Sequence, residues 1–524
     1  MIITGNNVTL DQVVRVAHDT TLSLELSPDA RQSMVKSRAF IENKIAGGEV
    51  MYGVNTGFGA FSSVRISDDE IERLQRNLIR SHCCGVGNYF SPEQTRAIMF
   101  LRANTLARGH SGIRPEVVDK ILEFLNHNVI PCVPSQGSVG ASGDLAPLAH
   151  LALALIGEGE VWSEADGKAE APTTSVPTKW EPKPCSQVLP AKNLIPLVLK
   201  AKEGLSLING CQVMTAVGLL AAAQTRRLLF MADAAGAMTL EALKGSRKAF
   251  DPLIAATRPH PGEAKTARNM LKILGDSSPI SLSHTHCNKV QDAYSLRCIP
   301  AVHGATKDAL RRTVETLEIE ANSSTDNPLV FADDGKILSC GNFHGEPVAF
   351  VLDYLGIAVS AMASMSECRI EKLINPNTSD LPAFLTPQGG LNSGHMIVQV
   401  CAAALVSENK ILAHPASVDS IPTSADKEDH VSMGTIAARK LQQIVANAEN
   451  ILAMELLSAS QALDFLKPLS PAGAVLAFYQ HIRSRVPFAN EDRIFSKDIA
   501  TLREMIENSE LENLLFSQVK NLEW

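Results

Sequence analysis

The chain has 524 residues, 45% of them hydrophobic and 20% charged, which is the balance of a folded globular protein and not of a disordered one. At this length we expect one large unit with sub-domains and a sizeable buried core. The formal net charge of -8 lacks the basic excess that binding to a phosphate backbone requires, so nucleic acid is not an expected partner.

Cysteine usage and the start of the chain both favour an intracellular protein. Ten cysteines are scattered without paired spacing, which predicts reduced thiols and not a disulfide framework. The first residues lack the basic start and apolar run of a secretory signal. The most apolar long stretch, Cys211 to Met238, contains Arg226, Arg227 and Asp233, which are costly inside a bilayer. We therefore expect a buried helix there, no membrane partner and a cytoplasmic location.

The predicted elements begin with short pieces separated by glycine and proline, among them a tight loop from Tyr52 to Gly59. From Glu70 to His82 the apolar residues fall on one helical stripe, which predicts an amphipathic helix. The sequence Ser91-Pro92-Glu93-Gln94 offers an N-cap, a proline at the first helical position and a capping-box glutamine. A helix should begin there and stop at Gly109.

The rest of the chain predicts mainly helices. An apolar helix over residues 145–156 should end at Gly157, and residues 158–187 form a surface excursion in which four prolines prevent any long regular element. Long helical runs follow at about 202–244, 301–321, 346–374, 394–413 and 432–465. We expect a mainly α protein, with a smaller mixed N-terminal region over residues 1–207 and a long-helix bundle over residues 208–524.

The run over residues 346–374 is apolar most of the way round, and such helices are usually buried on more than one side. Either an oligomer with a shared helical core or a large monomeric bundle would bury them. Composition favours neither.

The most unusual segment is the run of small residues from Gly137 to Gly143, which leads through Asp144 into the apolar helix. A phosphate-binding P-loop needs a lysine followed by Ser or Thr after its second glycine, and no lysine is present. A hydrolase nucleophile elbow needs glycines two residues on either side of its serine, whereas Asp144 stands two residues after Ser142. Both of these functions are excluded, while a plain tight turn or helix cap stays open.

The order Ala141-Ser142-Gly143 allows a further interpretation. In a tightly bent chain the amide nitrogen of Gly143 can attack the carbonyl carbon of Ala141, because neither residue has a side chain large enough to obstruct it. Loss of water from the resulting ring and from Ser142 would leave an exocyclic methylene, a strong electrophile. The positive end of the helix that follows would favour the negative charge that develops on attack.

This segment resembles the methylidene-imidazolone loop of the aromatic amino-acid ammonia-lyases and aminomutases. The resemblance runs from about Tyr52 to about Leu469, in separated blocks at residues 52–59, 137–150, 209–210, 291–297, 341–347, 389–394 and 417–433. It implies a 4-methylidene-imidazol-5-one (MIO) group made autocatalytically from Ala141, Ser142 and Gly143, with no external cofactor. It also implies a homotetramer whose active sites combine residues from neighbouring subunits.

Within this family the choice of substrate depends on two positions. The pair Ser81-His82 resembles the histidine-specific members, although some tyrosine aminomutases carry it too. Glu428 stands where the tyrosine and phenylalanine enzymes usually have an amide, and a carboxylate suits the N–H donor of an imidazole. An alternative is that Glu428 caps the helix that opens near Ser432. We expect His82 and Glu428 to bind the substrate.

The resemblance also implies the catalytic residues. Tyr294 matches the family's base, and a phenol can act as one where nearby positive charge favours its ionised form. Arg297, one helical turn on, matches the clamp on the substrate carboxylate, although the two could be a plain helix-surface pair. Tyr52 resembles a second tyrosine that assists elimination and closes the site, or it is an aromatic plug on a loop.

Three further residues match positions around the prosthetic group or the substrate. Asn209 resembles a hydrogen-bonding partner of either one, with a structural bond between helices as the alternative. Gln291 resembles a polar neighbour of the prosthetic group, and Phe343 resembles the aromatic wall beside the ring, or simple core. Asp144 is expected to support the tight loop and is a candidate helper in cyclisation.

No metal is expected. His284-Thr285-His286-Cys287 has short His and Cys spacing, but no second ligand cluster stands out. The expected activity is non-oxidative deamination of L-histidine to trans-urocanate and ammonia, the first step of histidine degradation. The alternatives are a tyrosine or phenylalanine ammonia-lyase or aminomutase of the same family, and a non-catalytic helical scaffold.

Overall fold

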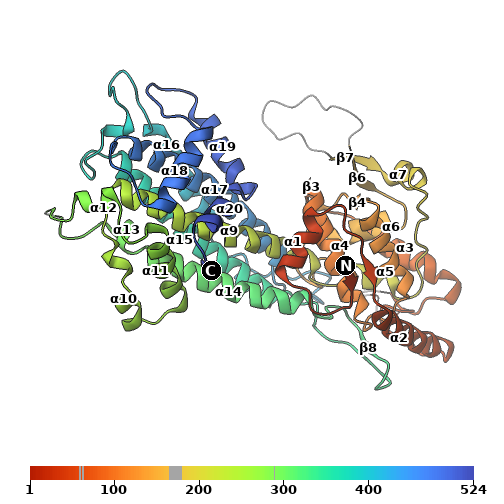
Figure 1. Ribbon diagram of the computed structural model, residues 1–524. Helices are drawn as coiled ribbons and strands as arrows, with labels where there is room; N and C mark the ends of the chain where they lie inside the picture. The colour runs from red at the N-terminus through yellow and green to blue at the C-terminus, as the bar shows by residue number, and fades with distance from the viewer. Residues whose placement is uncertain (58–60, 62–63, 165–179, 288) are drawn as a thin grey trace. The chain divides into compact units, whose positions relative to one another are not determined.

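The computed structural model describes residues 1–57, 61, 64–164, 180–287 and 289–524 (Figure 1). These residues form twenty α-helices, α1 to α20, and nine short strands, β1 to β9, so the predicted mainly α class is confirmed. They group into two compact units, each made of segments that are separate in sequence. The first comprises Met1–Leu220, Val314–Leu352 and Ala416–Arg439, and the second comprises Ala221–Thr313, Asp353–Pro415 and Lys440–Trp524.

The first unit holds most of the short elements. Its helices are α1 (Leu10–His18), α2 (Pro28–Ala46), α3 (Ile71–His82), α4 (Pro92–Ala107), α5 (Pro115–Asn126), α6 (Leu145–Leu155), α7 (Cys185–Ala191) and α8 (Glu203–Ile208), with a 3-10 turn at Asp68–Glu70. Its strands are β1 (Ile2–Ile3), β2 (Glu25–Leu26), β3 (Val86–Tyr89), β4 (Ile130–Pro131), β5 (Pro134–Gln136), β6 (Glu160–Glu164), β7 (Trp180–Pro184), β8 (Leu329–Phe331) and β9 (Lys336–Leu338).

The strands make only small sheets. Strand β1 pairs with β2 in parallel, and β3 with β5 and β8 with β9 pair antiparallel. The largest sheet has the order β4-β6-β7, with Trp162 opposite Ile130 on one side and Pro182 on the other. Part of the predicted surface excursion is thus a short antiparallel pair, while its residues 165–179 lie outside the described residues.

Local signals place the helices of the first unit as expected. Ser91 caps α4, because its hydroxyl accepts from the N–H of Gln94 and the Gln94 side chain accepts from the N–H of Ser91. Helix α4 ends before Gly109, which adopts a φ of 79°. Helix α3 buries Ile71, Leu78 and Ile79 on its predicted apolar stripe. The predicted helices at these positions are confirmed.

Four long helices have residues in both units: α9 (Gln212–Ala242), α14 (Ile299–Ala321), α15 (Glu346–Ile374) and α17 (Gly434–Asp464). The second unit adds α10 (Pro252–Thr257), α11 (Pro261–Leu274), α12 (Pro279–Ser283), α13 (Tyr294–Arg297), α16 (Met396–Leu412), α18 (Gly473–Arg485), α19 (Phe495–Glu507) and α20 (Glu510–Gln518), with 3-10 turns at Arg247–Phe250 and Ala383–Leu385. The long helical runs agree with prediction except at 202–244, which is broken between α8 and α9.

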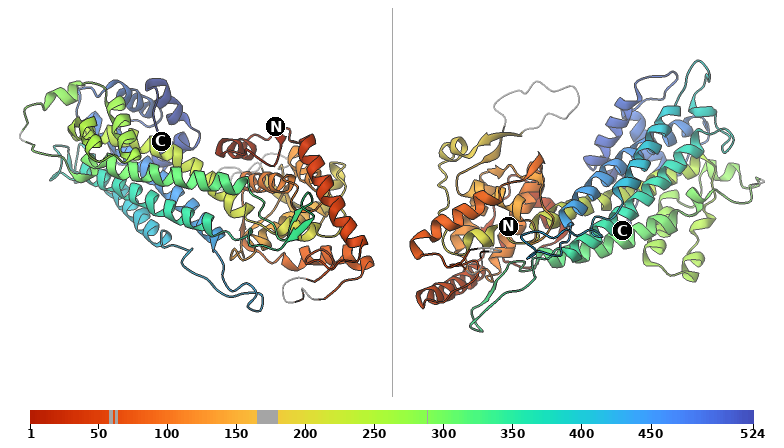
Figure 2. Two further views of the ribbon diagram at one scale, coloured as in Figure 1. Left: turned by 90° about the horizontal axis from the view of Figure 1, so that it is seen from below. Right: turned by 180° about the vertical axis from the view of Figure 1, so that it is seen from behind.

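In the second unit the long helices run side by side, as both views of Figure 2 show. Buried polar side chains join them. Arg369 of α15 forms a two-pronged ion pair with Glu455 of α17, at 2.6 and 2.8 Å. Asp233 of α9 accepts from Lys307 of α14 at 2.7 Å. These contacts satisfy charges that would otherwise be costly inside the bundle.

Helix α15 is the one helix among the described residues that is long and apolar enough to cross a membrane. However, 56% of its most apolar stretch is buried within the protein, as in the core helix of a folded domain.

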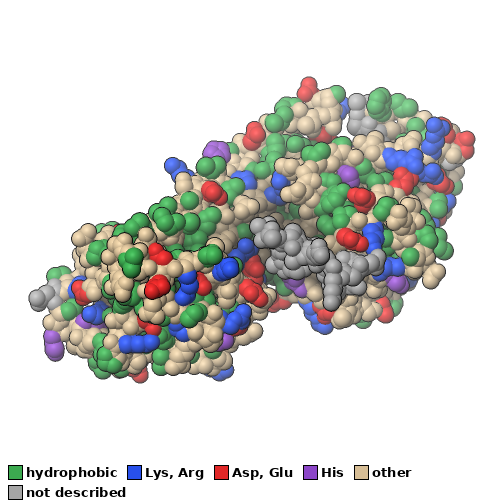
Figure 3. Space-filling model, turned by 90° about the horizontal axis from the view of Figure 1, so that it is seen from above, with side chains coloured by type: hydrophobic (Ala, Val, Ile, Leu, Met, Phe, Trp, Pro, Cys, Tyr) green, Lys and Arg blue, Asp and Glu red, His purple; other side chains and the backbone are tan. Residues whose placement is uncertain are grey.

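The surface drawn in Figure 3 carries acidic and basic side chains interspersed with hydrophobic ones. All ten cysteines are described and unpaired. The predicted division into a mixed region of residues 1–207 and a helix bundle of residues 208–524 stays a prediction.

Candidate active site

The tripeptide Ala141-Ser142-Gly143 lies against the break between α8 and α9. The N–H of Gly210 donates to the carbonyl of Ser142 at 3.2 Å, and the N–H of Asp144 donates to the carbonyl of Gly210 at 2.8 Å. Gly143 has a φ of 76°, and a Cβ added there would lie 2.1 Å from the carbonyl oxygen of Gly210. Only glycine fits this position, because it combines a left-handed backbone with the closest approach of another chain segment.

Asp144 anchors the end of this loop to two helices. Its Oδ2 accepts from the backbone N–H groups of Val213 and Met214, both at 3.0 Å, and so caps the first turn of α9. Its Oδ1 accepts from the hydroxyl groups of Ser138 and Thr435. Burial raises the pKa of Asp144 to about 6, although these four donors oppose the rise.

Asn209 is held at the break between α8 and α9 by a buried acid. Its Nδ2 donates to Oδ1 of Asp326 at 3.1 Å and to the carbonyl of Asn327 at 3.3 Å. Burial alone would raise the pKa of Asp326, but the ammonium group of Lys202 at 2.9 Å, the guanidinium of Arg102 and the hydrogen bonds to the carboxylate together lower that pKa. Because an ionised carboxylate only accepts, the amide nitrogen must face it, and the carbonyl oxygen of Asn209 is left for other partners.

A cavity of about 310 Å³ opens beside the tripeptide, a size that suits a small molecule. Predicted site residues from five separate segments share its wall: Tyr52, His82, Ser142, Asn209 and Glu428. The remaining lining is mostly apolar and consists of Phe61, Leu78, Leu145, Leu205, Ile208, Asn327 and Ser424. The structure therefore brings together five of the predicted residues around one cavity with both polar and apolar lining.

Glu428 points at the tripeptide. Its Oε1 accepts from the hydroxyl of Ser142 at 3.3 Å, and its Oε2 accepts from the hydroxyl groups of Thr423 and Ser424, each at 2.8 Å. None of these donors belongs to the first turn of α17, which begins at Gly434. Glu428 therefore forms none of these hydrogen bonds with α17, and the alternative in which it caps that helix is wrong.

His82 and Tyr52 line the same cavity from α3 and from the glycine-containing loop. The Nδ1 of His82 lies 2.8 Å from the carbonyl oxygen of Leu78, so this nitrogen carries the proton and donates it. The other ring nitrogen, Nε2, is left as an acceptor. Tyr52 also borders a second cavity, with Lys44, Glu49 and Pro328 among its lining residues.

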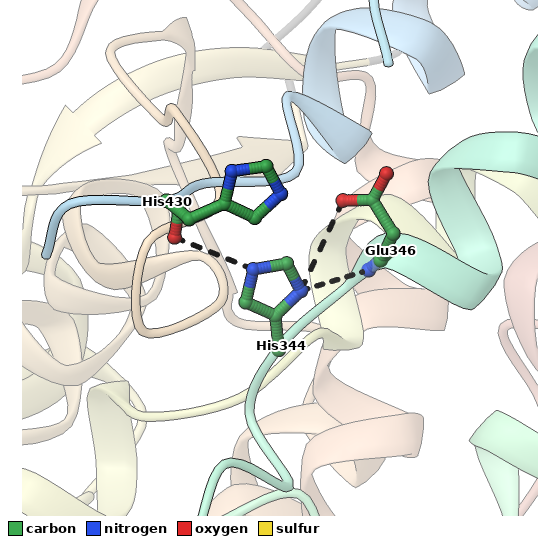
Figure 4. A group of neighbouring side chains, drawn as sticks. All are labelled: His344, Glu346 and His430. Carbon is green, nitrogen blue, oxygen red and sulfur yellow. Dashed lines mark hydrogen bonds and ion pairs between the residues drawn. The ribbon is translucent and has the colours of Figure 1, made fainter. Parts of the chain in front are cut away.

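Phe343 is half-buried. Its neighbour His344 is hydrogen-bonded to His430, which lies two residues after Glu428. His344 Nε2 donates to the carbonyl of His430 at 3.3 Å, while its Nδ1 accepts from the N–H of Glu346 at 3.3 Å (Figure 4). The two imidazole rings stack with centroids 5.7 Å apart. His344, Glu346 and His430 each offer one possible metal-ligand atom, and these atoms lie within 4.8 Å of one another. However, both ring nitrogens of His344 already form hydrogen bonds within the fold.

Three predicted site residues lie in the second unit, at and before the short helix α13. Gln291 and Tyr294 are exposed, Tyr294 by 71%. The guanidinium of Arg297 lies over the ring of Tyr294 at 4.4 Å from its centroid, and its Nε donates to the carbonyl of Asp292 at 3.0 Å. Tyr294 and Arg297 are therefore in contact, and their roles as base and carboxylate clamp stay predictions.

The histidines between α12 and α13 are part of a surface turn. His284 Nδ1 donates to the carbonyl of Ile280 at 2.8 Å, and both His286 and Cys287 are exposed. These side chains form no group of converging metal-ligand atoms among the residues that the structure describes.

Sequence reasoning missed the residues that orient the lining groups. Asp326 holds Asn209, and the hydroxyl groups of Thr423 and Ser424 hold Glu428. Asp326 lies over one hundred residues from Asn209, so no local pattern could reveal it. For Thr423 and Ser424, proximity to Glu428 was an available signal.

Comparison with known proteins shows the family of this chain. The model of the aromatic amino acid lyase family matches residues 8–484. The chain belongs to this family. The predicted family resemblance is thus confirmed, and it extends beyond the blocks from which it was inferred.

Members of the family with known names lie close in sequence and in structure. The chain is 50% identical to a histidine ammonia-lyase of Anaeromyxobacter sp. (strain K) over 98% of this chain and 99% of the relative. A crystal structure of histidine ammonia-lyase from Trypanosoma cruzi is 40% identical, with a TM-score of 0.89 over 99% of this chain and 96% of that one. Tyrosine aminomutase from Streptomyces globisporus is 34% identical, with a TM-score of 0.92 over all of both chains.

Proposed function

We propose that this chain catalyses the non-oxidative deamination of L-histidine to trans-urocanate and ammonia. The observation that carries the proposal is the carboxylate of Glu428, which lies beside Ser142 in the wall of a cavity sized for a small molecule. A carboxylate oxygen is a natural acceptor for the N–H of an imidazole ring and offers nothing comparable to a phenyl ring. Several relatives that are 46–50% identical over nearly the whole chain carry the name histidine ammonia-lyase.

The segment around Ser142 fits an internally formed MIO group. The tripeptide is bent by Gly143, backed by the peptide at Gly210 and anchored by Asp144, while the Ser142 side chain reaches the cavity. Asn209, with its amide nitrogen held by Asp326, would contact the group or the substrate. Once formed, the group would supply an electrophile that makes the substrate amine a better leaving group.

The residues of this chain then bind the substrate and move its protons. We assign Tyr294 as the base that removes the β-proton and Arg297 as the clamp on the substrate carboxylate. Tyr52 closes the cavity and assists elimination of the amine. Holding the amino acid at several points is what places the weakly acidic proton next to its base.

The remaining predicted residues would surround the substrate ring and the prosthetic group. His82 offers its Nε2, an acceptor, on one side of the cavity, and Glu428 offers a carboxylate oxygen. Phe343 would form a wall of the ring site, and Gln291 would neighbour the prosthetic group.

We further propose a homotetramer in which Gln291, Tyr294 and Arg297 of one subunit complete the cavity of another. Their segment is exposed on its own chain, with Tyr294 exposed by 71% and Val290 by 96%. Apolar side chains are also exposed on the long helices, at Tyr354 and Ile357 of α15 and at Ile397, Val400 and Ile411 of α16. An oligomer would bury such residues, which are costly to leave in water.

The proposal is tested by incubating the purified protein separately with L-histidine, L-tyrosine and L-phenylalanine and following the ultraviolet absorbance of the unsaturated acid. We expect turnover of histidine alone. Chiral analysis for β-amino acids checks for aminomutase chemistry, which the likeness to the tyrosine aminomutase makes the second candidate. Turnover of tyrosine but not of histidine would overturn our assignment of Glu428.

The role of Glu428 is tested by Glu428→Gln, which keeps the shape of the side chain and removes its charge. We expect kcat/KM for histidine to fall by roughly tenfold or more, since hydrogen bonds to charged groups are stronger than neutral ones. Glu367, on α15 in the second unit, accepts from the side-chain amide of Gln399 at 2.6 Å and is not among the residues that line the cavity. Glu367→Gln is therefore the matched control and should retain full activity. Unchanged kinetics in Glu428→Gln would contradict the proposed role.

A further inference from the structure

The segment that carries Glu428 is a tight hairpin with an unusual backbone. The N–H of Thr423 donates to the carbonyl of Glu428 at 2.9 Å, and the N–H of Glu428 donates back to the carbonyl of Thr423 at 3.3 Å. Between them Ser424, Ala425 and Asp426 have φ values of 52°, 54° and 59°. Three consecutive non-glycine residues in the left-handed region are costly, and such strain persists mainly at sites that bind ligands.

The hairpin also divides the two oxygens of the Glu428 carboxylate between different tasks. Thr423 Oγ1 and Ser424 Oγ both donate to Oε2, each at 2.8 Å. Oε1 instead lies 3.3 Å from Ser142 Oγ, on the side of the cavity. One oxygen is therefore tied to the protein, and the other is presented to whatever occupies the cavity.

The two hydroxyl groups have an effect that the backbone bonds do not. The hairpin is already closed by its pair of N–H to carbonyl bonds, so it does not need the hydroxyl groups to form. The last torsion of a glutamate side chain is broad and roughly two-fold, so an untethered carboxylate would sample many orientations. Two donors on a single oxygen remove that freedom and leave the lone pairs of Oε1 in a fixed direction.

We propose that Thr423 and Ser424 are positioning residues for substrate selection: they lock the Glu428 carboxylate so that Oε1 can accept from a ring N–H of the substrate. This inference rests on the proposed deamination of histidine. Neither hydroxyl needs to touch the reacting atoms. Their effect is to prepare Glu428 before the substrate arrives, so that binding does not have to order it.

The first test compares two substitutions at one position. Thr423→Val keeps the shape of the side chain and removes the hydroxyl, whereas Thr423→Ser keeps the hydroxyl. We expect Thr423→Val to lower kcat/KM for L-histidine by about tenfold, mainly through KM, and Thr423→Ser to remain near the wild type. Ser424→Ala should resemble Thr423→Val. If Thr423→Val and Thr423→Ser have the same kinetics as the wild type, the inference is wrong.

A second test separates positioning from a merely structural role of the hydroxyl. In a Glu428→Gln background, Thr423→Val should lower kcat/KM by far less than tenfold, because the charged group that it orients is gone. Equal losses in both backgrounds would overturn the inference. Thermal unfolding and intact mass of each variant show that the fold and the loss of two waters from the tripeptide are preserved.

The two proposals fail in different ways. If wild-type protein forms no urocanate from histidine, the proposed function itself fails. If the wild type is active and the hydroxyl groups of Thr423 and Ser424 are dispensable, only the positioning inference fails.

Discussion

Asp144 of the first unit and two acids of the second, Asp233 and Glu455, are buried carboxylates that are stabilised in opposite ways. In the first unit Asp144 is held by two hydroxyl groups and two backbone N–H groups. In the second unit the corresponding partners are cations, Lys307 beside Asp233 and Arg369 beside Glu455. All three acids are almost fully buried, so the difference lies in what surrounds them and not in their access to water.

Because their partners differ, Asp144 and Asp233 gain a proton over different pH ranges. Burial raises the pKa of Asp144 to about 6, because neutral donors offset only part of the lost hydration. Burial would also raise the pKa of Asp233, but the charge of Lys307 and the hydrogen bonds from Lys307 and His303 reverse the shift and lower it to about 2. The acid beside the reactive loop can thus gain a proton near neutral pH, while the acid in the helix bundle stays charged.

The largest expected effect is a loss of turnover, without a loss of stability, from a substitution in the first unit. Ser142→Ala removes the hydroxyl that must leave as water, so turnover should fall by about a thousandfold or more while the fold is kept. Intact mass should show no loss of two waters in the variant. Ser366→Ala, which removes a hydroxyl bound to Glu455 at 2.5 Å, is the control and should leave the mass change intact. Retained activity in Ser142→Ala would refute the assignment of the tripeptide.

Next in size is the loss of a charge partner within the second unit. Glu455→Gln leaves the buried guanidinium of Arg369 without its counter-charge, which should lower the free energy of unfolding by about 3–5 kcal/mol. Chemical denaturation measures this change. The double variant Arg369→Met with Glu455→Leu should recover much of the loss. A stability change below about 1 kcal/mol in Glu455→Gln would show that the pair is not the main support of the bundle.

A pH-dependent effect on stability is expected from Asp144 of the first unit. The folded pKa of Asp144 lies above its unfolded value, so its contribution to stability is fully present below pH 3.8 and is lost as pH rises through about 6. This rise from 3.8 to about 6 corresponds to roughly 3 kcal/mol.

Asp144→Asn removes the titration. The difference in unfolding free energy between variant and wild type should therefore change between pH 4 and pH 6 and be flat above it. Denaturation at a series of pH values measures it. Asp233→Asn is the contrast, since its folded pKa of about 2 places the change below pH 4. A difference curve for Asp144→Asn that is flat from pH 4 to pH 6 would contradict this account.

The smallest effects come from a matched pair of threonines. Thr435 donates to Asp144, and Thr239 donates to Glu455 at 2.8 Å. Thr239→Val should cost about 1 kcal/mol, because Arg369 still satisfies Glu455. Thr435→Val should cost a similar amount but should also lower the fraction of chains that lose two waters, as seen by intact mass. Equal cyclisation in both variants would show that the anchor of Asp144 does not affect the loop.

Much of the fold could be predicted from local patterns. The capping box at Ser91, the apolar stripe of α3 and the long apolar runs of α14 to α17 are properties of short segments, and the structure confirms them. The run predicted over residues 202–244 failed because Gly210 ends α8 with a φ of 140°. An isolated glycine inside an apolar run does not reveal whether a distant segment will press against it, as Gly143 does here.

The candidate site could likewise be predicted only in part from the sequence. Motifs pointed to Tyr52, His82, Asn209 and Glu428 one at a time, and the structure places all four on one cavity with Ser142. The partners that orient them, such as Asp326 for Asn209, lie far away in sequence and carry no motif of their own.

The sequence by itself determined the helical class and the family and pointed to the tripeptide Ala141-Ser142-Gly143, because each depends on residue types at short and regular spacing. Only the tertiary structure decided that Asp144 is anchored by neutral donors, that Asn209 is turned by Asp326 and that one oxygen of Glu428 faces Ser142. The physical reason is that burial and hydrogen-bond direction arise from contacts between distant segments. Those contacts, and not the residue types, set the charge and the orientation of each group beside the tripeptide.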